Sequence, residues 1–211
     1  GGAGQDITFS STLDNADNES VTLNAGAAGD ITVTGAVGDL GTGDIVVTNA
    51  TDVTFSSTVD ADNFTQVAGA AGGTTTFSGL IDLATAFAFT GQNLTITGAG
   101  ANDVDGTMTV TNAGTFTLDE GSTLTPGGTF TQNGAGANVI GDDITGGAGL
   151  SFLRAVTLTS GTANDIIVFT SGGGAGQDIT FSSTLDNADN ESVTLNAGAA
   201  GDITVTGAVG D

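Results

Sequence analysis

The feature that most constrains this chain is an internal repeat without a single mismatch. Residues 1–39 read GGAGQDITFSSTLDNADNESVTLNAGAAGDITVTGAVGD, and residues 173–211 are identical to them, 172 positions later. We call these segments the first and second copies. Self-similarity at a fixed period is the sequence signature of repeat architectures. The identity predicts one repeat unit over residues 1–172 and the start of the next identical unit over residues 173–211. A natural tandem array is the favoured origin, and an engineered duplication is the alternative.

A second, weaker repeat lies inside the 172-residue period. Its members share the order Asp, apolar, any residue, apolar, then Thr or Ser, as in DITFSST, DITVTGA, DIVVTNA and DVTFSST, which begin at residues 6, 30, 44 and 52. Asp30 follows Asp6 by 24 positions, and Asp52 follows Asp30 by 22 positions. These spacings predict a recurring unit of about 22–24 residues that holds two or three short strands.

Apolar residues alternate with threonine in these segments. Because residues two apart on a strand share one face, each strand offers an inward apolar pair and an outward threonine. Clusters of Gly, Asn, Asp and Ala-Gly separate the strands, as expected for turns. Helix signals are almost absent, and residues 80–86 could form one helical turn. The predicted buried residues are Ile7, Phe9, Val33, Val53, Phe55, Leu94, Ile96, Phe116 and Leu118, and the predicted outward residues are Thr8, Thr32, Thr54, Thr95 and Thr117.

Strands with only two inward residues cannot enclose a separate core, whereas stacked coils can. The pattern therefore predicts an all-β chain folded as a parallel β-helix, or β-solenoid, with about 22–24 residues per coil and roughly eight coils per 172-residue period. At ~4.8 Å between neighbouring strands, one period forms ~38 Å of rod. A sandwich of hairpins is the alternative. Hairpins favour Asn-Gly or Asp-Gly turns, and these occur only at Asp105-Gly106 and Asn133-Gly134.

Composition excludes several classes of function. The 211 residues include no Cys or His, one Lys or Arg (Arg154) and 24 Asp or Glu, for a formal net charge of −23. Disulfide scaffolds, thiol enzymes and Cys/His zinc sites need residues that are missing. Nucleic-acid binding needs a basic face that neutralises phosphates, and no apolar run approaches the ~20 residues of a membrane helix. We therefore expect no nucleic-acid partner, no membrane insertion and no enzymatic activity.

One acidic pair bears on the last of these expectations. Gly141-Asp142-Asp143 is similar to the aspartate pair of parallel β-helix pectin-cleaving hydrolases, and two carboxylates can act as acid and base on a glycosidic bond. Those enzymes also use a His and a basic pair, whereas this chain has neither His nor Lys. A turn between Ile140 and Ile144 is the favoured interpretation.

Acidic loops are the candidate metal sites. Calcium takes six to eight oxygen ligands from carboxylates and carbonyls, and loops 14–19, 60–63 and 102–105 concentrate such groups without forming a complete motif. The alternative is that these loops are solvated turns that keep the chain soluble. Structural calcium is the one cofactor considered. Its candidate ligands are Asp14, Asp17, Glu19, Asp60, Asp62, Asp103 and Asp105.

The repeats DITFSST…SVTLNAGAAGDITVTGAVGD resemble the β-strand repeats of giant bacterial surface proteins of the filamentous-haemagglutinin and autotransporter-like types, over essentially the whole chain. The resemblance implies a right-handed parallel β-helix outside the cell. It also implies a structural repeat of a very long surface or filament-forming protein that acts as a rigid stalk or fibre. The expected partners are further copies of the chain, joined as covalent tandem repeats or by head-to-tail and lateral association.

Two other functions are compatible with an extracellular solenoid. The first is an adhesin whose solenoid face binds glycans or a surface, but Trp and Tyr are absent and most Phe residues alternate into the predicted core. The second is an ice-binding solenoid, because outward Thr-x-Thr pairs recur, as at Thr95/Thr97 and Thr157/Thr159. These pairs do not recur at one fixed period, which disfavours ice binding.

Overall fold

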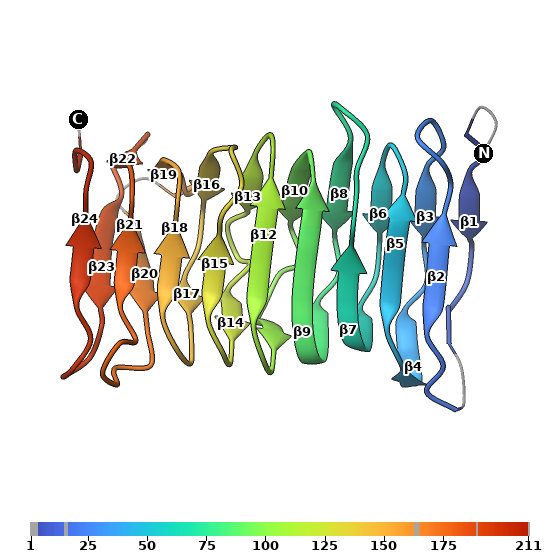
Figure 1. Cartoon of the computed structure of the whole chain (residues 1–211), viewed down its shortest axis with the longest axis horizontal. Helices are drawn as coiled ribbons and strands as arrows, with labels where there is room; N and C mark the ends of the chain where they lie inside the picture. Colours follow the sequence, from blue (N-terminus) through green and yellow to red (C-terminus); the bar gives the residue numbers. More distant parts are fainter. Residues whose placement is uncertain (1–3, 15–16, 163–164, 189, 211) are drawn as a thin grey trace.

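The computed structural model describes residues 4–14, 17–162, 165–188 and 190–210. These residues form 24 β-strands and no helix, and none of them lies in a helix that could cross a membrane. Neighbouring strands run parallel and stack side by side along the long axis of the molecule, with the two chain ends at opposite ends of the stack (Figure 1). The predicted all-β parallel solenoid is confirmed.

The first face of the solenoid is a nine-stranded sheet with one strand from each coil. Its strands are short because an apolar-Thr-apolar triplet is followed at once by turn residues. In spatial order they are β1 (Ile7–Phe9), β3 (Ile31–Val33), β6 (Val53–Phe55), β8 (Thr74–Phe77), β10 (Asn93–Ile96), β13 (Phe116–Leu118), β16 (Asn138–Ile140), β19 (Val156–Leu158) and β22 (Leu185–Asn187).

The second and third faces belong to one 15-stranded sheet. Two long strands, β7 (Val59–Gln66) and β9 (Ile81–Gly91), continue from the second face onto the third. The second face also contains β4 (Val37–Thr42), β11 (Asn102–Val104), β14 (Leu124–Pro126), β17 (Ile144–Thr145), β20 (Ile166–Thr170) and β23 (Ser192–Asn196). The third face also contains β2 (Val21–Asn24), β5 (Ile45–Asn49), β12 (Met108–Asn112), β15 (Phe130–Gln132), β18 (Leu150–Phe152), β21 (Ile179–Phe181) and β24 (Ile203–Val205).

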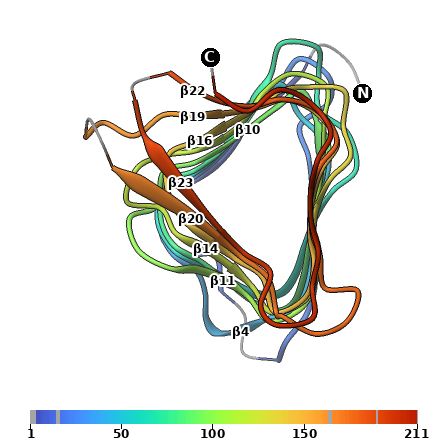
Figure 2. The same cartoon turned by 90° about the vertical axis from the view of Figure 1, so that its left-hand side faces the viewer.

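Viewed along the stacking axis, the coils have a three-sided outline (Figure 2). Most coil-to-coil steps along the first face, such as the step from Ile31 to Val53, have the predicted length. The coils from Thr75 to Leu94 and from Asn138 to Val156 are shorter than predicted, and the coil from Val156 to Leu185 is longer. The strands stay in register, so the connections between them absorb these differences in length.

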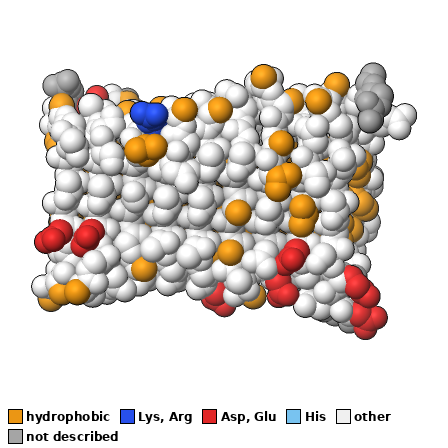
Figure 3. All heavy atoms as spheres, viewed as in Figure 1, with side chains coloured by type: hydrophobic (Ala, Val, Ile, Leu, Met, Phe, Trp, Pro, Cys, Tyr) orange, Lys and Arg blue, Asp and Glu red, His pale blue; other side chains and the backbone are white. Residues whose placement is uncertain are grey.

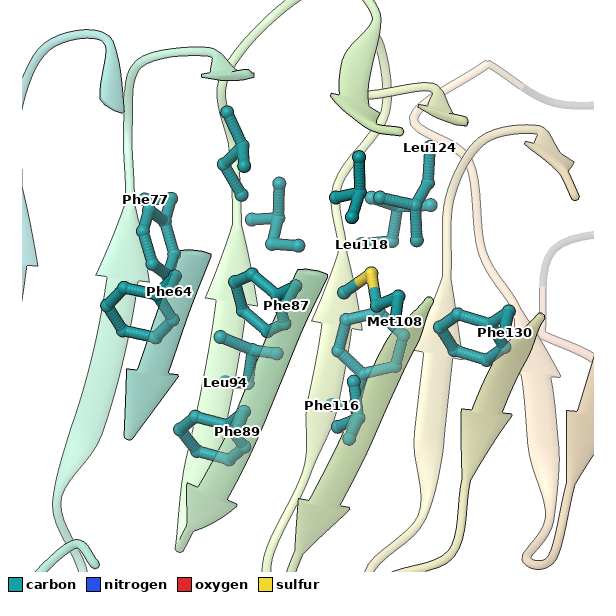
Figure 4. Close-up of a cluster of buried hydrophobic side chains, with 14 of the residues drawn as sticks. Phe64, Phe77, Phe87, Phe89, Leu94, Met108, Phe116, Leu118, Leu124 and Phe130 are labelled. Atoms are coloured by element: carbon teal, nitrogen blue, oxygen red, sulfur yellow. The ribbon is translucent and has the colours of Figure 1, made fainter. Parts of the chain in front are cut away.

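A continuous column of apolar side chains fills the interior of the coils (Figure 4). Ten of the 11 Phe residues are fully buried, and many of their rings stack between neighbouring coils. The ring centroids of Phe55 and Phe77 lie 5.1 Å apart, as do those of Phe152 and Phe181. Each such pair contributes about 0.5–1.5 kcal/mol beyond the burial of its area, so the aromatic stacks join successive coils.

The predicted core is confirmed where a coil lies on both sides. The buried members are Val33, Val53, Phe55, Leu94, Ile96, Phe116 and Leu118. Ile7 and Phe9 are only half-buried, although they pack against the core. Their strand, β1, is the first of its sheet, and within the described part of the chain it pairs only with β3. The predicted outward threonines all lie at exposed or half-buried positions.

The helical alternative for residues 80–86 is wrong. This segment contributes to strand β9, in which Ile81 and Leu83 are buried and Asp82 and Ala84 are exposed. Alternation with a period of two residues is the pattern of a strand with one face buried. The segment forms a strand because Ile81 and Leu83 point inward together and stack on the equivalent residues of the adjacent coil.

Candidate functional site

The two identical copies fold alike over the residues that the structure describes. Strand β1 pairs with β3 through Ile7 opposite Ile31. Strand β21 pairs with β24 in the same register, through Ile179 opposite Ile203. The backbone hydrogen bonds that join these strand pairs also recur at equivalent positions. The same local sequence therefore builds the same pair of stacked strands at both ends of the chain.

The two copies differ in what covers them. In the first copy, Ile31 and Val37 are 0% and 1% exposed, because residues of the next coil, such as Val59, pair with them. In the second copy, the equivalent Ile203 and Val209 are 47% and 57% exposed. An uncovered strand presents free N–H and C=O groups that pair readily with another strand. This open edge is the surface that a further coil covers elsewhere in the same molecule.

The first candidate calcium loop, residues 14–19, contacts the candidate segment 60–63, which was predicted as a loop but is part of strand β7. Asn18 Nδ2 donates a hydrogen bond to Asp62 Oδ2 at 3.0 Å, although the two residues lie in different coils. Gly43 lies in the coil between them, where a Cβ atom would come within 2.6 Å of the Asn18 carbonyl oxygen. The side-chain amide of Asn18 therefore spans the intervening coil at Gly43, where no side chain stands in the way, and reaches Asp62. Glu19 is exposed, and its carbonyl oxygen accepts from Gly43 N–H at 3.3 Å.

Three carboxylates on the second face form what we call the acidic row: Asp60, Asp82 and Asp103. Asp60 is opposite Asp82, and Asp82 is opposite Asp103, on neighbouring strands that lie ~4.8 Å apart. All three residues are exposed. A hollow of about 190 Å³, also lined by Thr58 and Leu80, lies beside Asp60 and Asp82. The prediction that Asp60 and Asp103 lie in loops is wrong, because they lie in strands β7 and β11. The sequence motifs did not single out Asp82, because only the inter-coil register reveals the row.

The other candidate ligands lie outside the acidic row. Asp14, Asp17 and Asp105 are exposed residues in connections between strands. In the view of Figure 3 most of the visible acidic side chains lie towards one long border of the molecule, and most of the visible face is uncharged. No group of three or more His, Cys, Asp or Glu among the described residues is arranged to hold a metal ion. Calcium binding stays a prediction.

Divalent cations are expected to raise the thermal stability of the chain. Carboxylates of the acidic row repel one another in a molecule of net charge −23, and counterions screen such repulsion. We expect the melting temperature to rise by a few degrees between chelator and millimolar calcium, which corresponds to about 1 kcal/mol. Asp82→Asn should reduce this rise. Asp119→Asn, which removes one exposed charge outside the row, is the matched control. Identical melting temperatures with and without calcium would contradict cation binding by the acidic row and leave it only a role in solubility.

The carboxylates of Asp142 and Asp143 accept hydrogen bonds from the backbone of neighbouring coils. Asp142 Oδ2 accepts a hydrogen bond from Gly121 N–H at 2.7 Å. Asp143 Oδ1 accepts one from Val168 N–H at 2.7 Å. Both residues lie in the connection between β16 and β17, so the prediction of a turn there is confirmed. Their carboxylates tie three successive coils together.

The first face carries a row of outward threonines, one in each of six successive coils. Their register is continuous although the coil from Thr76 to Thr95 is shorter than its neighbours. The irregular period in the sequence was therefore no argument against a regular surface. The row consists of Thr8, Thr32, Thr54, Thr76, Thr95 and Thr117. Carboxylates flank it, since Asp30 Oδ1 accepts from Asp52 N–H at 3.1 Å in the adjoining column.

Buried amide side chains close one corner of the solenoid, and the sequence motifs did not predict them. Gln132 Nε2 donates to Asn112 Oδ1 at 2.7 Å and to the carbonyl oxygens of Gly134 and Gly136 at 3.2 and 3.3 Å. Gln132 and Asn112 are fully buried. A buried polar group is tolerated only when it is hydrogen-bonded. The available signal was strand parity, because Gln132 lies two positions after the inward Phe130.

Comparison with known proteins adds no family. No protein-family model, no curated protein and no solved structure matches the chain. The features that bear on its function are therefore the repeat, the open edge, the acidic row and the outward threonine row.

Proposed function

We propose that the chain is a structural repeat of an extracellular filament-forming or surface protein, in which successive 172-residue units continue one rigid solenoid. The observation that carries the proposal is the open edge of the second copy, where Ile203 and Val209 are exposed although the identical Ile31 and Val37 are buried. The remainder of the second unit would supply a strand equivalent to β6 and cover β24 as β6 covers β3. The location outside the cell rests on the resemblance of the repeats to those of bacterial surface proteins.

The architecture suits a mechanical task. Each inner strand of the nine-stranded sheet pairs with a strand on either side, so hydrogen bonds run along the whole stack. In such quasi-one-dimensional folds each coil contacts only its neighbours, and stability accumulates with every added coil. Length is therefore gained without a new type of core. A rod of this kind spans distance and presents other modules.

The competing functions find less support. A glycan-binding face uses aromatic side chains that stack on sugars, whereas ten of the 11 Phe residues lie inside and Trp and Tyr are absent. An ice-binding face needs a continuous hydroxyl surface. The outward threonine row is followed by Val139 in the next coil, and the column beside it carries Asp6, Asp30 and Asp52. Charged groups hold their own hydration water, so this face is a poor template for ordered water.

Adding one further 172-residue unit to the chain should lengthen the particle without widening it. At ~4.8 Å per coil the expected increase is ~37 Å in maximum dimension, at constant cross-section. Small-angle scattering and negative-stain imaging measure both quantities. A compact or branched particle would contradict the rod.

The substitution Ile203→Asp tests whether a further coil covers the open edge when the chain is lengthened. In the 211-residue chain the side chain of Ile203 is half exposed, so the aspartate should change the melting temperature little. In the lengthened chain the next coil would bury it, as Ile31 is buried, and an unpaired buried charge should cost about 3–5 kcal/mol. Thr204→Asp, an outward change of equal charge, is the control and should be tolerated in both chains. Equal tolerance of Ile203→Asp in both would refute coverage by a following unit.

A further inference from the structure

The two identical copies lie on different faces of the solenoid. Strand β1 belongs to the first face, whereas its twin β21 pairs with β18 and β24 on the third face. Strand β2 pairs with β5 on the third face, whereas its twin β23 pairs with β20 on the second. Figure 1 shows β21 and β24 in the row that contains β2 and β5, and β1 and β3 in the row behind. Each element of the second copy is displaced by one face in the same direction.

The number of turns in one period explains this displacement. Starting from β1, the chain returns to the first face at β3, β6, β8, β10, β13, β16 and β19, which is seven full turns. It then crosses the second face at β20 and reaches the third at β21, before the eighth turn is complete. The full period from Ile7 to Ile179 therefore spans seven and two-thirds turns. The short coil before Val156 and the long coil after it contribute to this fraction.

We propose that successive repeats are set one third of a turn apart around the rod axis, so that every lateral surface recurs on a new face in each repeat. The inference rests on the proposed function, because it requires a following repeat in the same rod. After three repeats the turns add up to a whole number, and each surface returns to its starting face. At ~4.8 Å per coil this corresponds to an advance of ~37 Å per repeat and ~110 Å per full cycle.

The rotation determines how such rods can meet one another. With a whole number of turns per period, a given surface would recur along one side only, and lateral contacts would favour flat ribbons. With one third of a turn, the acidic row of Asp60, Asp82 and Asp103 moves from the second face to the first in the next repeat, and to the third in the one after. Any lateral contact that such a surface makes would therefore be offered in three directions around the rod.

Paired cysteines test the rotation in the 211-residue chain, which has no cysteine of its own. Ser151 is opposite Thr180 across β18 and β21, so Ser151→Cys/Thr180→Cys should form a disulfide under mild oxidation. Neighbouring strands place Cα atoms ~4.8 Å apart, within the range that disulfides span. If the second copy instead continued the first face, Thr180 would follow Thr157. Thr157→Cys/Thr180→Cys should keep both thiols free.

The control pair is Thr54→Cys/Thr76→Cys, which joins two coils of the first face in the middle of the chain. All three variants are compared by thiol titration of the monomer fraction. We expect loss of thiols for the control and for the 151/180 pair, and full retention for the 157/180 pair. Cross-linking of the control and not of the 151/180 pair would overturn the rotation and leave the solenoid intact. If the control pair failed to cross-link, the result would instead contradict the stacking of coils on which the proposed function depends.

Discussion

Replacing Phe181 with alanine is expected to lower the free energy of unfolding by about 3–5 kcal/mol, the usual cost of deleting a buried aromatic ring and leaving a cavity. Phe181 is 0% exposed, and β21 lies between β18 and β24. Its ring stacks on Phe152 with the centroids 5.1 Å apart and meets the edge of Phe169 at 5.3 Å. The substitution therefore removes packing with Phe152 of the preceding coil and with Phe169 of the same coil, as well as the ring's own burial.

Phe9 provides a control within the same molecule. It occupies the equivalent position of the identical first copy, in the same Ile-Thr-Phe strand. It is only half-buried because, among the residues that the structure describes, β1 has a neighbouring strand on one side only. Phe9→Ala should cost about 1–2 kcal/mol, the share expected for partial burial. The pair of variants thus compares one residue type in one local sequence at two degrees of cover.

Urea unfolding followed by circular dichroism gives the two free-energy losses. In a solenoid each coil interacts only with its neighbours, so hydrogen exchange should show that Phe181→Ala first loosens the coils around β18, β21 and β24. Phe9→Ala should affect only the coil that begins with β1. Losses of equal size for the two variants would contradict the assignment of a covered and an uncovered copy.

The fold could be predicted from the sequence because in a solenoid the tertiary contacts follow from the local repeat of inward and outward residues. An inward pair such as Leu94 and Ile96 meets equivalent residues in the adjacent coils, so the local alternation already specifies the tertiary contact. Ile7 and Phe9 departed from the prediction for a related reason. Full burial of these side chains needs a coil on each side of the strand. The second copy has both coils, so Ile179 and Phe181 are buried, whereas Ile7 and Phe9 of the first copy are only half-buried.

Coil length and rotation could not be predicted in the same way. Alternation identifies the strands but says little about the connections, so the short coil before Val156 and the long coil after it were missed. Rotation depends on the sum of all coils in a period. A small error in each of them accumulates, and an error of a third of a coil moves the second copy to another face.

The candidate sites were missed for a different reason, which is that they depend on register. Asp82 sits between Asp60 and Asp103 only when three coils are aligned, and no spacing in the sequence fixes that alignment. Gln132 and Asn112 read as ordinary surface amides by type. Their inward parity was visible, but parity alone does not show whether the partners that make burial tolerable are present.

The buried amide corner carries the second large prediction. Beyond its three donated hydrogen bonds, Gln132 accepts through Oε1 from Asn138 Nδ2 at 3.4 Å and from Arg154 N–H at 3.3 Å. Methionine has nearly the same volume, so Gln132→Met removes the polar contacts while leaving no cavity. Buried groups that lose their partners cost about 1–3 kcal/mol each. Because the loss is shared among several weak contacts, we expect about 3–5 kcal/mol in total.

Gln66 is the matched control for this substitution. It lies in the same column of the third face, which runs from Gln66 through Phe89 and Val110 to Gln132, and it is also buried. Its Oε1 accepts a hydrogen bond from Thr75 Oγ1 at 2.8 Å, so Gln66→Met should cost about 1–2 kcal/mol. Urea unfolding measures both variants. If Gln66→Met proved as costly as Gln132→Met, the amide network would add nothing beyond one buried hydrogen bond, and the corner would be held by its backbone alone.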